Sequence, residues 1–279
     1  MSAITEPCVI DGMSDETYHA DPVEGGSLSS TGARAILKSP ARFAWDRTHR
    51  VEKRTFDVGH AAHAKILGVG MGVVEIPTEH LTPSGNVSTK GATTAWLTEQ
   101  RAAGLVPVTP TDLADVDAMA ESVLAHKPAR DILEGPGRPE QSVFAPDPET
   151  GVWLRARIDW LDDRAVDLKT TTSANPDEFS RTAAEYGYDI QQEMYLHTLR
   201  LVGLGDMPFL FIAVEKTAPY LPSVVELDAE FAAIGRQRVR RAIDTYKTCR
   251  DADAWPGYEE IVHLVAPPRW LAYEEGLVI

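Results

Sequence analysis

The feature that most constrains the fold is a change of sequence period in the middle of the chain. From residue 141 to residue 171 the text QSVFAPDPETGVWLRARIDWLDDRAVDLKTT alternates apolar and polar residues, broken only at PDPETG and DDR. A period of two is typical of strands, whose side chains point alternately to the two sides of a sheet, and both interruptions are rich in turn-forming residues. The segment therefore predicts three consecutive antiparallel strands.

Helical patterns precede and follow these strands. Helices are expected over 28–45 with a break at Ser39-Pro40, over 56–68, and over 111–133 with Thr111 as cap and a break at Lys127-Pro128. The strands are followed by a helix over 177–201, the apolar strand MPFLFIAVEK and a long helix over 227–249. Before the strands, residues 77–110 are expected to form surface connections around a short helix near Trp96. This order predicts an α/β or α+β fold with a central mixed sheet, containing an antiparallel hairpin and flanked by helices.

The chain length fits one large domain. With 279 residues, of which 43% are hydrophobic and 25% charged, the chain is long enough to bury a sizeable core. We expect a single domain over 1–279, with a helical N-terminal region at 1–55, a core at 56–250 and a tail at 251–279.

Charge and cysteine usage exclude some classes of protein. The formal net charge of -15 disfavours a nucleic-acid binder, although cations in an acidic pocket reverse the local sign. Cys8 and Cys249 form no CxxC pair, so a disulfide framework and a four-cysteine metal centre are excluded. The N-terminal text MSAITEPCVIDG lacks the basic start of a secretory signal and no long apolar run occurs, which predicts a cytoplasmic protein without a membrane partner.

The hairpin at RIDWLDDRAVDLKTT places charged residues inside strand text. A turn at DDR would pair Asp159 with Asp167, and directly paired residues project on one face with Cβ atoms about 4.5–5.5 Å apart. Lys169 and Arg157 share that face because side chains alternate along each strand. The opposite, dry face then collects Leu154, Ala156, Ile158, Trp160, Val166 and Leu168.

Two carboxylates held this close repel one another unless a cation compensates their charge. Oxygen ligands suit Mg²⁺ or Mn²⁺, and a lysine beside such a site can orient or activate an attacking water. The alternative is a solvent-facing hairpin in which Lys169 is only an ion-pair partner of the aspartates.

The hairpin resembles the active-site motif of the PD-(D/E)XK nucleases, and within them the RecE-like (exonuclease VIII type) recombination exonucleases of phages and prophages. Asp159 is followed by WLDDRAV and then by Asp167-Leu168-Lys169, with Ile158 in the place of the family's proline. GHAAH resembles the G-x-x-x-H helix motif of this type, and places His63 as the histidine ligand.

Two further texts extend the resemblance, which covers about residues 13 to 250. QQEMY matches the Q-x-x-x-Y helix motif with Gln191 and Tyr195, and Pro139-Glu140 supplies the acidic residue of the strand before the hairpin. The cysteine count excludes the iron–sulfur branch of these exonucleases, because that branch needs four cysteines.

The resemblance implies a Mg²⁺-dependent exodeoxyribonuclease, with Mn²⁺ as an alternative ion, that degrades linear double-stranded DNA. It implies 5′-to-3′ degradation that leaves 3′ overhangs, a single-strand annealing protein as partner in phage-type recombination, and a homo-oligomeric ring. The implied roles are catalysis by Lys169, Asp159 and Asp167, metal binding by His63, Asp159, Asp167 and the Leu168 carbonyl, DNA contacts by Gln191, Tyr195 and Arg157, and support by Glu140.

Several alternatives remain open at the level of sequence. His60 competes with His63; Gly59, on the same helix face as His63, would let the helix approach the sheet and favours His63. Gln191 and Tyr195 can pack at a helix edge, and Glu140 can pair an arginine. The basic segment Arg236 to Lys247 is either a solvated helix face or a DNA track. The rival functions are an endonuclease or a nuclease of other polarity on the same fold, and an inactive DNA-end-binding module.

Overall fold

A seven-stranded mixed sheet forms the centre of the protein. The computed structural model describes residues 3–49, 55–70, 72–268, 271 and 273. The strand order is β1-β5-β6-β7-β8-β9, and β2 pairs in parallel with β6. The strands are β1 (Cys8–Ile10), β2 (Leu28–Ser29), β5 (Arg138–Pro146), β6 (Trp153–Leu161), β7 (Ala165–Thr171), β8 (Phe209–Glu215) and β9 (Pro222–Glu226). The predicted antiparallel strands β5, β6 and β7 are confirmed, and the parallel pairing of β7 with β8 makes the sheet mixed, as expected.

The register of the hairpin is confirmed at its turn and wrong beyond it. Leu161 pairs with Ala165 and Trp160 with Val166, but Asp159 and Asp167 form no ladder pair. The ladder between β6 and β7 ends at this point, whereas β7 pairs along its whole length with β8 on its other edge. Oδ2 of Asp159 accepts a hydrogen bond of 2.7 Å from the Leu168 N–H, so a side chain bridges the two strands where the backbone ladder stops.

The prediction of one dry face and one polar face on the hairpin is wrong. Leu154, Ala156 and Ile158 belong to the first apolar core cluster, whereas Trp160, Val166 and Leu168 belong to the second. Helices cover both sides of this sheet, so both faces of its central strands carry buried side chains. The alternation of apolar and polar residues along the hairpin therefore did not predict that three of these six residues lie in each cluster.

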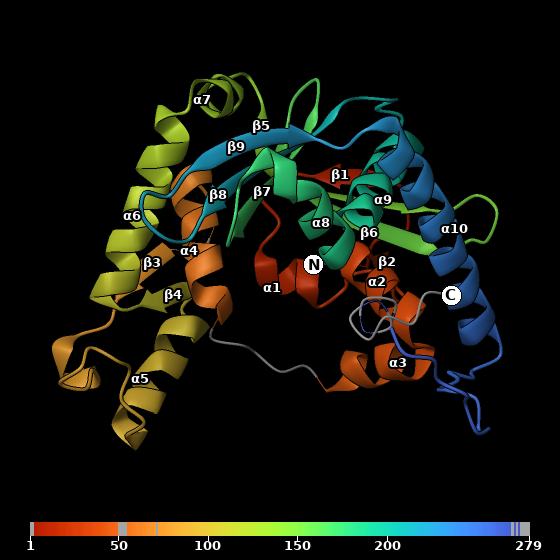
Figure 1. The fold of residues 1–279 in the computed structure, drawn as a ribbon, viewed down its shortest axis with the longest axis horizontal. Coiled ribbons are helices and arrows are strands. Elements are labelled where there is room, and N and C mark those ends of the chain that lie inside the picture. Colours follow the sequence, from red (N-terminus) through yellow and green to blue (C-terminus); the bar gives the residue numbers. More distant parts are fainter. Residues whose placement is uncertain (1–2, 50–54, 71, 269–270, 272, 274–279) are drawn as a thin grey trace.

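The first core cluster lies between the sheet and five helices, which stand at the right of the view in Figure 1. They are α2 (Ser30–Lys38), α3 (Pro40–Thr48), α8 (Pro176–Tyr186), α9 (Tyr188–Leu201) and α10 (Ala229–Asp251). Ser39 ends α2 and caps α3, where its Oγ accepts from the Arg42 N–H and Pro40 takes the first turn, so the expected break is confirmed. The single helix predicted over 177–201 is instead two, because Gly187 adopts a left-handed φ of 67° between them.

The second core cluster lies on the other side of the sheet, under α4 (Thr55–Leu67), α6 (Pro110–Ala125) and α7 (Lys127–Leu133). The N-cap of α6 is Thr109 rather than the predicted Thr111: its side chain accepts from the Asp112 N–H, and Pro110 fixes the first helical turn. Two short parallel strands, β3 (Gly72–Glu75) and β4 (Leu105–Val108), were not predicted; a 3₁₀ turn (Thr78–His80) and α5 (Gly91–Ala102) lie between them in the chain.

The N-terminal segment adds a strand and a short helix beside the sheet. Strand β1 pairs with β5, and α1 (Asp15–His19) places Tyr18 against Phe144 in a third apolar cluster. Neither element has a periodic sequence signal, because the strand has three residues and the helix five. Among the described residues, no helix is long and apolar enough to cross a membrane.

Candidate active site

The residues that carry the predicted chemistry come together where β6 and β7 separate. Asp159 lies on β6, Asp167 and Lys169 on β7, His63 on α4 and Gln191 on α9. His63 Nδ1 lies 3.5 Å from Asp159 Oδ2, and Lys169 Nζ lies 2.6 Å from Asp167 Oδ2. Asp159 and Asp167 are only 8% and 2% exposed, so their charges are held away from bulk water. Elements far apart in sequence therefore build one polar site in the sheet.

Three of these side chains form a group with the spacing of metal ligands. His63, Glu140 and Asp159 each offer one ligand atom, and the three atoms lie within 4.8 Å of one another. Glu140 stands opposite Asp159 in the register of β5 and β6, but it leaves the ladder and adopts a φ of 52°. The sequence assigned Glu140 only a supporting role; the structure brings its carboxylate to the position of a possible ligand.

The protonation behaviour of the group fits a divalent cation. Burial, with Asp167 and Glu140 nearby, raises the pKa of Asp159 well above its ordinary value. Burial also raises the pKa of Glu140, although Arg157 opposes this effect. Burial of the His63 ring lowers its pKa to about 4, which keeps the imidazole neutral, the form that binds metals. Crowded carboxylates that resist ionisation beside a neutral imidazole are a donor set that a divalent cation would stabilise.

Lys169 is held on three sides. Its Nζ donates to Gln191 Oε1 over 2.8 Å, and Gln191 Nε2 donates to Asp167 Oδ1 over 2.5 Å, so one amide bridges the aspartate and the lysine. The ammonium group also lies 4.9 Å from the centre of the Tyr188 ring, a cation–π distance. Tyr188 was not identified from the sequence. Its position one helical turn before Gln191 was the signal that could have found it.

The Arg157 side chain is used inside the protein. Its guanidinium pairs with Glu140 through Nε and with Asp15 through Nη1 at 3.2 Å, and its Nη2 donates to the Met13 carbonyl over 2.9 Å. It also lies over the Tyr18 ring. Glu140 was expected either to support the site or to pair with an arginine. The pair with Arg157 is present, and it orients the Glu140 carboxylate toward the ligand group. A DNA contact by Arg157 stays a prediction, and the role of Asp15 left no trace in the sequence pattern.

The remaining predicted residues take varied positions. Tyr195 is 8% exposed and packs edge-on against Phe209 with ring centres 6.0 Å apart, and burial raises its pKa well above 10. Its DNA contact therefore stays a prediction, as does metal binding by the Leu168 carbonyl. His60 is exposed and lies outside the ligand group found among the described residues. A Cβ on Gly59 would lie an ordinary 3.7 Å from Thr170 Oγ1, so the approach of α4 does not require glycine there.

Comparison with known proteins places this site in a recognised fold. No curated protein matches the chain. A crystal structure from Eubacterium rectale named "Putative exonuclease" is similar, with a TM-score of 0.62 at 10% identity over 95% of this chain and 99% of that one. LHK-Exo in complex with dAMP covers 71% of this chain and 95% of that one at 14% identity, with a TM-score of 0.25 that is too low to compare folds. A family described as "PDDEXK-like domain of unknown function (DUF3799)" matches residues 29–266, most of the chain, and the protein belongs to that family.

Proposed function

We propose that this protein is a metal-dependent nuclease that hydrolyses phosphodiester bonds in DNA. The observation that carries the proposal is the convergence of two groups at one place in a PDDEXK-like domain: the ligand group His63, Glu140 and Asp159, and the bridged pair of Asp167 and Lys169. Buried acids that crowd one another are costly for folding, and they are found where a site needs them.

The residues divide the work of hydrolysis between them. His63, Glu140 and Asp159 would hold a divalent cation, Mg²⁺ or Mn²⁺. Asp167 and the Leu168 carbonyl are further proposed ligands. When bound, such an ion supplies positive charge that offsets the charge developing on the scissile phosphate. Lys169, fixed by Asp167, Gln191 and Tyr188, presents an ammonium group that can orient the attacking water toward the phosphorus.

The proposed substrate is the end of linear double-stranded DNA, degraded 5′ to 3′ to leave a 3′ overhang. The support is the resemblance of the G-x-x-x-H, D-x-K and Q-x-x-x-Y motifs to those of RecE-like exonucleases. A single-strand annealing protein as partner, a homo-oligomeric ring and a cytoplasmic location are further parts of the proposal, with the same support.

The choice between an exonuclease and its rivals is tested with labelled DNA. Linear duplexes labelled at one 5′ or 3′ end, and closed circles of the same sequence, are incubated with the full chain in Mg²⁺ or in a chelator. We expect Mg²⁺-dependent release of the 5′ label as mononucleotides from linear DNA and no change in the circles. Cutting of circles would identify an endonuclease, release of the 3′ label first would reverse the polarity, and binding of ends without cutting would favour the inactive module.

The amide of Gln191, which bridges Lys169 and Asp167, is expected to contribute moderately to the rate of cleavage. Replacing Gln191 by leucine keeps a similar volume at a position that is 5% exposed, but it removes both hydrogen bonds that tie Lys169 to Asp167. Partners that orient the groups of a metal site are typically worth about 10–100-fold in activity, so we expect a loss of that size in the cleavage rate. The rise in Tm that divalent ions cause should remain, since the ligand group is intact. An unchanged rate would show that the bridge has no catalytic role.

A further inference from the structure

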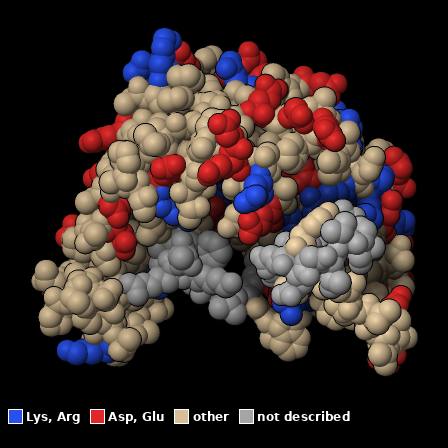
Figure 2. Space-filling model, viewed as in Figure 1, with Lys and Arg blue, Asp and Glu red and all other residues tan. Residues whose placement is uncertain are grey.

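A basic groove runs along the outer face of α10, away from the ligand group. It has a volume of about 760 Å³ and is lined by Arg236, Arg240, Arg241 and Thr245 of α10, by Pro40 at the start of α3, and by Pro256 of the segment after α10. Figure 2 shows blue side chains gathered over α10, at the right of the molecule, on a surface that elsewhere carries many acidic residues. In a chain of net charge -15, a groove with this concentration of arginine is a local exception.

Two of the three groove arginines have no charged partner among the residues that the structure describes. Arg240 is occupied: it donates to both carboxylate oxygens of Asp147, at 3.0 and 3.1 Å, and pairs with Asp244 at 2.9 Å. Arg236 and Arg241 are exposed, and neither makes an ion pair or side-chain hydrogen bond with any described residue. Arg240 is shared by three carboxylates, those of Asp147, Glu149 and Asp244, so the positive charge available to a ligand comes from the other two arginines.

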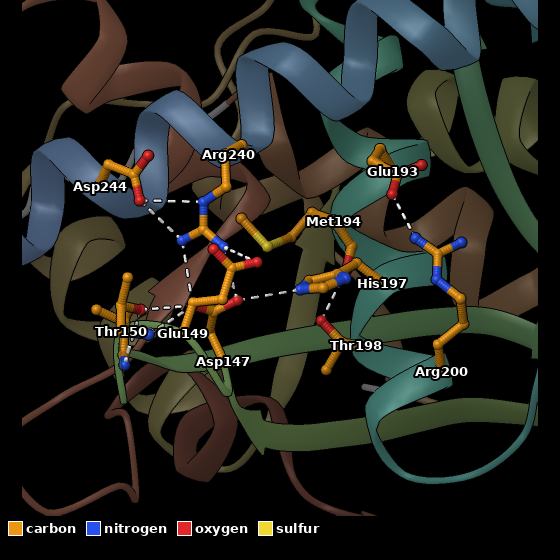
Figure 3. A network of polar contacts seen from close by, with 11 residues as sticks. Asp147, Glu149, Thr150, Glu193, Met194, His197, Thr198, Arg200, Arg240 and Asp244 are labelled. Atoms are coloured by element: carbon orange, nitrogen blue, oxygen red, sulfur yellow. Dashed lines mark hydrogen bonds and ion pairs between the residues drawn. The ribbon is translucent and has the colours of Figure 1, made fainter.

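The wall of the groove is held rigidly by the contacts drawn in Figure 3. Asp147, in the turn between β5 and β6, is 1% exposed and accepts from Thr150, His197 and Arg240. Although burial favours its protonated form, the hydrogen bonds from Arg240 and Thr150 lower the pKa of Asp147 below its ordinary value. The charged network therefore fixes the middle of α10 to the central sheet.

Helix α10 is also fixed to the helix that carries Gln191. Arg238 donates to both carboxylate oxygens of Asp189 at 2.9 Å. Gly235 packs so tightly on α9 that an added Cβ would lie 2.5 Å from the Asp189 carbonyl oxygen. Asp189 follows Tyr188, whose ring lies under the Lys169 ammonium group. The groove and the candidate active site are thus parts of one rigid arrangement.

We propose that this groove binds backbone phosphates of the DNA substrate, at nucleotides outside the scissile phosphate. The inference rests on the proposed nuclease function. Its donors are the guanidinium groups and the Gln237 amide, side-chain types that contact phosphates without reading the base sequence. The groove would supply locally the positive charge that the acidic chain as a whole lacks.

The experiment compares two double variants in the Lys169→Ala background, where binding is measured without cleavage. Arg236→Ala/Arg241→Ala removes the free charges of the groove, whereas Lys247→Ala/Arg250→Ala removes the same charge from the same helix outside it. Binding of a fluorescent duplex of about 30 base pairs is followed by anisotropy over a range of salt concentrations. The slope of log K against log salt is negative, and each lost phosphate contact reduces its magnitude by about 0.9, so we expect a magnitude smaller by about 1.8 for the groove variant and unchanged for the control.

Each outcome bears on the proposal. Equal affinity and equal salt slope in the two double variants would overturn it and leave the nuclease function standing. A change of oligomeric state in the groove variant alone, measured by light scattering, with DNA binding unchanged, would also overturn it and identify the groove as an interface between copies. Absence of DNA binding by the Lys169→Ala parent would overturn both proposals together.

Discussion

Replacing Lys169 by alanine is expected to lower the rate of DNA cleavage by about 10²–10⁴-fold, the range that a positioned proton-transfer or charge-stabilising group contributes. The loss follows from the position of the ammonium group, which is held between Asp167, Gln191 and the Tyr188 ring and has no neighbouring lysine in this site to replace it among the described residues. The measurement is the single-turnover rate on linear duplex DNA at saturating Mg²⁺. Because we propose that phosphate contacts along α10 contribute to the affinity for DNA, the binding constant should change little.

The matched control for this substitution is Lys216→Ala, which removes an exposed lysine that directly follows the neighbouring strand β8. Its rate should equal that of the unmodified chain. A Lys169→Ala protein that keeps its Tm and cleaves DNA at the unmodified rate would remove this lysine from the mechanism. Restoration of activity by Lys169→Arg would indicate that only positive charge is needed there.

The second large effect is expected from Asp159→Asn, which should abolish DNA cleavage and at the same time stabilise the metal-free protein. The pKa of Asp159 is raised in the folded protein by burial and by Asp167 and Glu140. An acid whose pKa is higher in the folded than in the unfolded chain destabilises the folded state once the pH exceeds its unfolded value. In a chelator at neutral pH, Asp159→Asn should therefore raise the Tm, while cleavage in Mg²⁺ should be lost.

Metal binding provides the cross-check on Asp159. A ligand that binds only the folded state stabilises it by about 2.7 kcal/mol at one hundred times its Kd, so Mg²⁺ or Mn²⁺ should raise the Tm of the unmodified chain. The rise should vanish in Asp159→Asn and persist in Asp163→Asn, a matched change at a turn aspartate whose side chain is 79% exposed. An equal metal-induced rise in both variants would show that Asp159 is not a ligand.

The sequence predicted the parts of this fold that depend on local pattern. The turn at DDR set the register of the hairpin, because three polar residues between two alternating runs permit one pairing near the turn. The residues His63, Asp159, Asp167, Lys169 and Gln191 lie on four different elements, so their meeting in one site was expected from the resemblance to RecE-like exonucleases and not from a local pattern. The break at Ser39-Pro40 was also local, because a proline without an N–H fixes a helix start.

What the sequence could not predict depends on partners distant in the chain. The ladder between β6 and β7 stops after two residue pairs, whereas β7 pairs along its whole length with β8 on its other edge, and no local period records this difference. The parallel strands β3 and β4 are four residues long and separated by a helix, so they lack a detectable alternation. Asp15 reaches Arg157 only because β1 pairs with β5, and this pairing positions the N-terminal segment.

The contacts of Arg157 also determine where the functional unit begins. The family match starts at residue 29 and the first motif residue is His63, yet Arg157, which orients Glu140, is held by the Met13 carbonyl and by Asp15. A chain cut at the family boundary would leave a guanidinium group that is 12% exposed with fewer partners, and removing one partner of a buried ion pair is costly. We therefore expect a chain that begins at residue 29 to be less stable than one that retains the segment around Met13.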